Sequence, residues 1–398
     1  MGASLVKMDV ELMDETRPLR IGITCHPSMG GSGVLATELG KELAARGHEI
    51  HFITSRMPAR LRHTCQRGIH FHEVHALHYP VFEHTPYMLA LAAKLAEVYR
   101  QSRLDLFHVH YAIPHAAAAI LARQMLEPCQ SPIVTTLHGT DVTLVGQDPS
   151  YHPMVRFCLE KSDAVTAVSD WLADTTREAF SPKREIRRIH NFADPERFQP
   201  GEKGLQRASF AAPEQTVFLH VSNFRPVKRV SDVIRIFARC VALGVDGVLA
   251  LAGEGPELAP ALELAQQLGI AARLRPMGQV SDISQLLPLS DIFLFPSDGE
   301  SFGLAPLESL LCEVPVIGAR AGGLPEVVAE GICGHLLPVG DIEGMAQACL
   351  VLVNAPEHRK EMGHQGRIHC MERFTPQAIV PRYEELYREL VRARTPCH

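Results

Sequence analysis

The chain has 398 residues, which is enough for two domains of ordinary size. Its 46% hydrophobic and 21% charged residues are typical of a globular protein, and a formal net charge of −6 gives no argument for nucleic acid or an anionic membrane. No apolar run approaches the roughly 20 residues of a membrane span, and no signal-peptide pattern opens the chain. Ten cysteines without Cys-x-x-Cys spacing argue against zinc sites and disulfide frameworks. We expect a cytoplasmic protein whose residues 1–18 form a loose extension.

Regular structure begins with a predicted strand, a glycine-rich loop and a helix. Residues 20–25 form the strand, residues 27–33 form the loop, and apolar residues recur at helical spacing over 34–43. A second strand follows at 49–54. Such a loop can bring backbone N–H groups against a phosphate. It matches neither G-x-G-x-x-G nor a P-loop, and alone it fits equally well a glycine turn that packs a helix on a sheet.

Strands and helices continue to alternate along the first half of the chain. Apolar runs predict strands at 106–110, 132–137, 164–168 and 187–190, and a helix from about 115 to 126. Residues 191–200 contain two prolines and show no periodicity, so we place a linker there. We therefore expect residues 19–195 to form one Rossmann-like domain.

The alternation then restarts. Strands are predicted at 216–221, 248–252, 274–277, 292–295 and 314–317, with a helix from about residue 230. We expect a second Rossmann-like domain at 196–375 and a C-terminal helix at 376–398 that could pack back on the first domain. Two successive arrays predict an α/β fold of two doubly wound domains facing a central cleft. Ligands bind at the carboxyl ends of such strands.

The segment from Ser297 to Ser309 carries two glutamates at a predicted turn-to-helix junction. Glu300 lies in the loop past a predicted strand, and residues 301–304 open the next helix with backbone N–H groups that suit an anion. Glu308 falls inside that helix, where a carboxylate can accept hydrogen bonds from sugar hydroxyls. This combination suits a nucleotide sugar. The spacing alone belongs more often to a helix N-terminus with two solvated glutamates.

Further polar residues follow other predicted strands. Arg225 and Lys228 supply two cations that suit a diphosphate. His138 follows a strand in the first half of the chain, in the sequence Leu-His-Gly-Thr-Asp. Each of these signals alone also fits an ordinary polar loop. Their joint placement at strand ends is a much stronger indication of a site.

Histidines are numerous, and several of the 21 lie close together in the sequence. The group comprises His63, His70, His72, His75 and His78. His70 and His72 would share one face of a strand. No nearby cysteine or carboxylate set completes a metal site, so we expect surface or hydrogen-bonded histidines and no metal.

Together these segments resemble the retaining GT-B glycosyltransferases that carry a Glu-x7-Glu motif. The resemblance covers about residues 19 to 390 and rests on segments 21–33, 108–114, 138–141, 222–229 and 299–308. Within that family the chain looks most like the subgroup that moves N-acetylglucosamine from UDP-GlcNAc to the hydroxyl of L-malate, the first step of bacillithiol biosynthesis. The resemblance implies a hexosyltransferase that needs no cofactor beyond its donor substrate and no metal.

The resemblance implies that the domain at 19–195 binds the acceptor and that the domain at 196–375 binds the nucleotide sugar. It also implies roles for individual residues. The catalytic set is His138, Arg225, Lys228 and Glu300. The donor-binding set is Gly31, Asn223, Gly278, Val280, Ser301, Phe302, Gly303, Leu304 and Glu308, in which Glu308 holds the ribose. The acceptor-binding set is Ser32, Tyr111, Thr136 and Arg156. Many relatives carry arginine where this chain has Asn223, which we interpret as a mark of the malate-using subgroup.

Several alternatives stay open at this point. Attack by the acceptor on the front face of the sugar is favoured, and double displacement is the other mechanism. The acceptor could instead be an inositol phosphate or a glycan, or the chain could be a catalytically silent UDP-sugar-binding protein. The amphipathic segment 88–103 has few cations, so we expect it to pack in the core rather than on a membrane. We expect paired subunits and no nucleic-acid partner.

Overall fold

The computed structural model describes residues 17–27, 30–61, 66–78, 81, 83–128, 131–201 and 207–394. His63, most of the expected extension at 1–18 and the end of the expected C-terminal segment lie outside the described residues.

The chain divides into two compact units. The first comprises the chain up to Thr136, Pro153–Val165 and the chain from Val380, and the second comprises Leu137–His152 and Thr166–Ile379. The domain boundaries expected from the sequence stay predictions.

The first sheet has seven strands in the order β3-β2-β1-β4-β5-β6-β7. The strands are β1 (Arg20–Thr24), β2 (Glu49–Thr54), β3 (Ile69–Glu73), β4 (Leu106–His110), β5 (Ile133–Leu137), β6 (Ala164–Ala167) and β7 (Ile186–Arg188). Parallel pairing joins β3 through β2, β1 and β4 to β5. The strand order reverses between β1 and β4, so this sheet has its topological switch point there.

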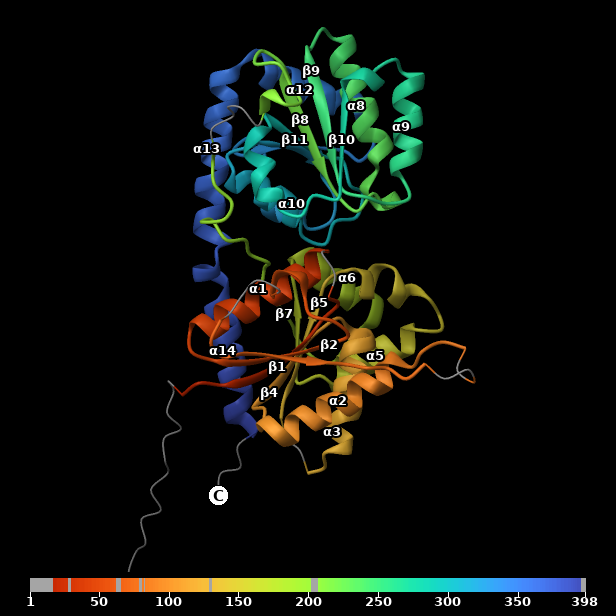
Figure 1. Cartoon of the computed structure of the whole chain (residues 1–398), viewed down its shortest axis with the longest axis vertical. Helices are drawn as coiled ribbons and strands as arrows, with labels where there is room; N and C mark the ends of the chain where they lie inside the picture. Colours follow the sequence, from red (N-terminus) through yellow and green to blue (C-terminus); the bar gives the residue numbers. More distant parts are fainter. Residues whose placement is uncertain are drawn as a thin grey trace, which may run out of the picture. The chain divides into compact units, whose positions relative to one another are not determined.

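Six α-helices accompany this sheet in the described residues. They are α1 (Gly31–Ala45), α2 (Tyr87–Ser102), α3 (Ala117–Met125), α4 (Thr140–Thr143), α5 (His152–Lys161) and α6 (Asp170–Phe180). In Figure 1, α2 and α3 lie side by side. Helix α2 buries Leu91, Leu95 and Val98 on one face, so the amphipathic segment packs its apolar side in the protein core. The helix expected from residue 115 begins two residues later, after an irregular helical turn at Ala112–Ala116.

The second sheet has six parallel strands in the order β10-β9-β8-β11-β12-β13. They are β8 (Thr216–Val221), β9 (Gly247–Ala252), β10 (Leu274–Gly278), β11 (Ile292–Phe295), β12 (Val316–Ala319) and β13 (Gly334–Leu337). Its order reverses between β8 and β11. Strand β12 begins two residues later than predicted, after Pro315, whose nitrogen has no hydrogen to donate. The sequence analysis missed β13.

Helices of the second half cover this sheet. They are α8 (Val230–Ala242), α9 (Leu258–Gln267), α10 (Leu304–Leu311), α11 (Leu324–Val327), α12 (Ile342–Asn354) and α13 (Pro356–Arg373). The last helix, α14 (Pro376–Arg394), belongs to the first unit from Val380 onward. Apolar residues of α8, α9 and α12 form one core cluster with the strands (Figure 1). From α14, the hydroxyl of Tyr387 lies 2.7 Å from Nδ1 of His108 in β4. Among the described helices, none combines the length and apolarity that crossing a membrane requires.

Candidate active site

Two loops meet at the switch point of the second sheet. One follows β8 and includes the short helix η4 (Pro226–Lys228), and the other follows β11. The N–H of Asp298 donates to the carbonyl of Val227 over 3.1 Å, and the ammonium of Lys228 pairs with the carboxylate of Glu300. The side chains of Lys228 and Glu300 are 18% and 17% exposed. The Lys228 ammonium also lies 5.3 Å from the ring centroid of Phe295. Two predicted catalytic residues therefore form one partly buried ion pair.

A buried histidine that the sequence analysis missed shapes the first of these loops. Nδ1–H of His220 donates to the carbonyl of Leu294 over 2.9 Å, and Nε2 accepts from the hydroxyl of Ser222 over 2.8 Å. The Ser222 oxygen in turn accepts the N–H of Phe224, a buried residue with φ +38°. Burial lowers the pKa of His220 to about 4, and the nearby Lys228 charge adds to the effect. A histidine inside an otherwise apolar strand was the available signal.

Glycines let neighbouring loops approach this site closely. A Cβ on Gly322, where φ is +60°, would stand 2.0 Å from the carbonyl oxygen of Glu300. The next residue, Gly323, donates its N–H to that same oxygen over 2.7 Å. On the other side, a Cβ on Gly255 would stand 2.1 Å from the carbonyl oxygen of Asn223. Side chains at these positions would displace the loops that carry Glu300 and Arg225.

Helix α10 begins at Leu304, so the expectation that the helix opens at Ser301 is wrong by three residues. Gly303 is the residue that precedes it, with φ +102°. The ring of Phe302 is buried against His190 and Phe374, so only its backbone can serve a ligand. Glu308 lies in the helix and is 7% exposed.

The remaining donor-side candidates lie at neighbouring strand ends. Asn223 and Arg225 are exposed in the loop after β8. Gly278 is the last residue of β10, has φ +61° and accepts the N–H of Gly253 through its carbonyl, over 2.8 Å. Val280 follows two residues later. These positions follow the carboxyl ends of β8 and β10, which pair with β9 on either side.

His138 belongs to a loop that lies against the Glu300 segment. The Asp141 carboxylate accepts the N–H of His138 over 3.3 Å and that of Gly139 over 3.0 Å. Gly139 has φ +113°, and a Cβ there would stand 1.7 Å from Oγ of Ser301. The structure therefore brings the His138 loop next to Ser301.

Three of the four acceptor-side candidates lie near the switch point of the first sheet. The hydroxyl of Tyr111, which follows β4, donates to Oγ of Ser32 in α1 over 3.0 Å. Tyr111 has φ +83°, a strained conformation of the kind that gathers at functional sites. Its N–H donates to the carbonyl of Thr136, whose buried Oγ1 lies 2.7 Å from Nε2 of His108. Arg156 is exposed on α5 and makes no hydrogen bond or ion pair within the described residues.

The sequence analysis missed two rings beside this group. The ring of His26 lies 5.2 Å from that of Tyr111 and 4.6 Å from that of His115. His26 is the second residue after β1, and its place at a strand end was the available signal. Gly31, expected in the loop, is the exposed first residue of α1, where backbone N–H groups lack intrahelical acceptors.

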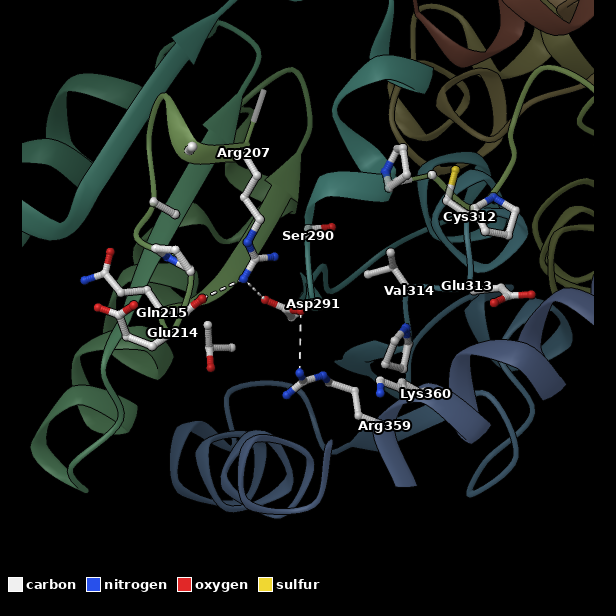
Figure 2. Close-up of a pocket in the computed structure, with 18 residues that line it drawn as sticks. Arg207, Glu214, Gln215, Ser290, Asp291, Cys312, Glu313, Val314, Arg359 and Lys360 are labelled. Atoms are coloured by element: carbon white, nitrogen blue, oxygen red, sulfur yellow. Dashed lines mark hydrogen bonds and ion pairs between the residues drawn. The ribbon is translucent and has the colours of Figure 1, made fainter. Parts of the chain in front are cut away.

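A cavity of about 820 Å³ lies elsewhere on the second sheet. Its lining includes Thr216, Asp291 and Pro315, which stand at or just before the amino ends of their strands. Figure 2 shows Arg207 and Arg359 reaching the carboxylate of Asp291, over 2.7 and 3.5 Å. The loops that carry Lys228 and Glu300 follow the opposite ends of the strands. This cavity is therefore distinct from the candidate active site.

Comparison with known proteins agrees with this geometry. The family described as Glycosyltransferase Family 4 matches residues 29–197, and Glycosyl transferases group 1 matches residues 202–369. The N-acetyl-alpha-D-glucosaminyl L-malate synthase of Bacillus anthracis is 47% identical over 94% of this chain and 98% of its own length. The chain belongs to the GT-B glycosyltransferases. The fold class, the family and the hexosyltransferase class expected from the sequence are thus confirmed.

More distant members of the GT-B glycosyltransferases share the fold or part of the sequence. A D-inositol 3-phosphate glycosyltransferase of Thermobifida fusca is 27% identical over 92% of this chain and 91% of its own. The structure of Anabaena HepE with UDP-glucose matches with a TM-score of 0.80 at 19% identity, over 93% of this chain and all of the other. Sucrose-phosphate synthase of Thermosynechococcus elongatus matches with a TM-score of 0.78 at 21% identity, over 95% of this chain and all of the other.

Proposed function

We propose that this glycosyltransferase moves N-acetylglucosamine from UDP-GlcNAc to the hydroxyl of L-malate, the first step of bacillithiol biosynthesis. The observation that carries the proposal is the 47% identity, over 94% of the chain, with a relative named for that product. The relatives named for inositol phosphate are more distant, at 27% identity over a similar length.

The proposed donor site uses the two loops at the switch point of the second sheet. Arg225 and Lys228 neutralise the diphosphate as it leaves, and Glu300 holds the Lys228 ammonium while accepting from a sugar hydroxyl. Glu308 accepts hydrogen bonds from the ribose, and the backbone from Ser301 to Leu304 receives the phosphates. Backbone near Gly278 and Val280 receives the uracil, with Asn223 and Gly31 completing the donor set.

The proposed chemistry retains the anomeric configuration and uses no metal. The malate hydroxyl oxygen bonds to the anomeric carbon on the face from which the phosphate leaves. The bond from that carbon to the UDP oxygen breaks, and the hydroxyl proton passes to the departing phosphate. The cations Arg225 and Lys228 supply the positive charge that this step requires. His138 lies against the donor sugar and positions it.

The proposed acceptor site is the group around Tyr111. The Tyr111 and Ser32 hydroxyls, 3.0 Å apart, offer hydrogen bonds to the carboxylates of malate. Thr136 supports Tyr111 through its carbonyl and is itself buried. Arg156, exposed on α5, would pair with a malate carboxylate. We further propose a cytoplasmic enzyme of paired subunits.

The experiment is an incubation with UDP-GlcNAc, with and without L-malate, that follows UDP release and product mass together. The proposal expects UDP release that depends on malate and a product with the mass of a GlcNAc–malate conjugate. Inositol 3-phosphate in place of malate serves as the matched acceptor comparison. Release with inositol phosphate and none with malate would overturn the proposed acceptor.

A further inference from the structure

A group of imidazoles and one carboxylate lies on one face of β2 and β3, apart from the loops that hold the donor candidates. Residues two apart on a strand share a face, so Glu49 and His51 lie together on β2, and His70 and His72 on β3. The two strands pair in parallel with His51 opposite His70. Among the described residues β3 is the edge strand of the first sheet, so no further described strand pairs with it beyond this group.

The distances in this group match those of a metal site. Oε1 of Glu49 lies 3.1 Å from Nε2 of His51 and 3.3 Å from Nε2 of His70. All three atoms lie within 4.8 Å of one another. Zinc binds nitrogen and oxygen at about 2.0–2.2 Å in a tetrahedron, which separates two of its ligand atoms by about 3.3 Å. The expectation that no carboxylate accompanies these histidines is wrong, because β2 brings Glu49 to them from 21 residues away.

His72 holds the central imidazole in place. Its Nε2 lies 2.9 Å from Nδ1 of His51, and the planes of the two rings are inclined by only 17°, with centroids 5.2 Å apart. His51 can therefore donate Nδ1–H to His72 and direct the lone pair of Nε2 at an ion, which is how metal-binding histidines are usually oriented.

The group is also reachable from solvent. The side chain of His51 is buried, while those of His70 and Glu49 are 49% and 41% exposed. Without an ion, the Glu49 carboxylate can accept hydrogen bonds from the ring N–H groups of His51 and His70. A divalent cation would take the place of those two hydrogens. Imidazole and carboxylate ligands suit zinc, whereas magnesium prefers oxygen ligands alone.

We propose that Glu49, His51 and His70 bind one zinc-type divalent cation, with His72 orienting His51. This ion ties the edge strand β3 to β2 and stabilises the first sheet. Glu49 opens β2 and His51 follows two residues later, so the ion lies toward the amino end of that strand. The candidate acceptor residues follow the carboxyl ends, so the ion takes no part in glycosyl transfer.

The test uses the full chain without a histidine tag, stripped with a chelator and dialysed against zinc chloride. Zinc per chain is counted by emission spectroscopy, and the melting temperature is measured with and without zinc. The variants are Glu49→Gln and His70→Ala at exposed ligand positions, and the matched control is His75→Ala, whose side chain is 80% exposed on the neighbouring segment. Circular dichroism and a cooperative thermal transition in the absence of zinc report that each variant is folded.

The proposal expects about one zinc more in the wild type and the His75 control than in either ligand variant. It also expects a zinc-dependent rise in melting temperature of several degrees in the first two proteins only. His72→Ala should weaken zinc binding about 10–100-fold while leaving the stoichiometry at saturation unchanged. Equal zinc uptake and equal melting shifts in wild type and ligand variants would overturn the proposal, as would a wild type that takes up none.

Discussion

The ammonium of Lys228 and the carboxylate of Glu300 pair across two loops that lie 72 residues apart in the sequence. Each loop follows one of the two strands, β8 and β11, between which the order of the second sheet reverses. Both side chains are mostly shielded from water. A charge in such surroundings acts more strongly on a neighbouring charge than it would in bulk water. The arrangement holds one cation ready at the position where a nucleotide diphosphate binds in doubly wound sheets.

Replacing Lys228 by methionine removes this cation while keeping most of its volume. We predict that kcat falls roughly 10²–10³-fold, the usual cost of losing one group that stabilises developing negative charge. Steady-state kinetics with saturating UDP-GlcNAc measure the change. The control is Arg239→Met, which removes a cation from an exposed ion pair with Glu343. A Lys228 variant with the turnover of this control would contradict the assigned role.

Glu308→Gln tests the ribose contact. The amide is nearly isosteric, but it lacks the negative charge that strengthens hydrogen bonds from hydroxyls. We predict that UDP binds more weakly by about 1–3 kcal/mol, measured by calorimetry. The matched change Glu361→Gln, at an exposed position of α13, should leave UDP affinity unchanged. Unaltered UDP affinity in Glu308→Gln would remove this residue from the donor site.

Much of the fold could be predicted because parallel strands are short apolar runs. The bounds of β2, β4, β8 and β11 agree with the predicted ranges. β13 escaped prediction because its four residues begin with Gly334, which lies against the carbonyl of Val316 where a Cβ would stand 2.1 Å away. Such a glycine indicates a close approach only when the neighbouring strand is known.

The candidate site was harder to predict than the fold. Lys228 and Glu300 could be expected at the same edge of the sheet, because the carboxyl ends of parallel strands lie together. Their ion pair also requires β8 and β11 to be neighbouring strands, which the sequence does not specify. His220 donates to the backbone carbonyl of Leu294, and Gly322 lies against the backbone carbonyl of Glu300. A sequence does not specify which backbone group a side chain will meet. Arg156, assigned to the acceptor group from the family resemblance, is exposed on α5, and its role stays a prediction.

Gly322→Ala tests whether the loop after β12 fixes the Glu300 backbone. The matched control is Gly269→Ala, where φ is also positive, at +72°, but a Cβ would have open space. Both variants should lose roughly 1–2 kcal/mol of stability from the left-handed backbone. Gly322→Ala should lose about 1–3 kcal/mol more from overpacking, and should also bind UDP less tightly. Equal losses in urea denaturation would show that the close approach is unimportant.

His220 should make stability depend on acidity. Its pKa is about 4 in the folded protein and about 6.5 when unfolded, so only the unfolded chain takes up this proton between those values. Stability is therefore complete above about pH 6.5 and falls as the pH falls toward 4. By pH 5 the loss from this group is roughly 2 kcal/mol. Urea denaturation of wild type and His220→Gln at pH 7.5 and 5 should show a smaller decrease in the variant, and equal decreases would contradict the assignment.

The most direct measurement of the proposed function is a proton NMR time course of the enzyme with UDP-GlcNAc and L-malate. We predict that the donor signal decays only when malate is present, and that the first new sugar signal is an α-anomer bonded to the malate oxygen. An α-linked first product keeps the α configuration that the anomeric carbon has in UDP-GlcNAc. A β-linked first product, or free N-acetylglucosamine formed at the same rate without malate, would contradict the account of a retaining malate transferase.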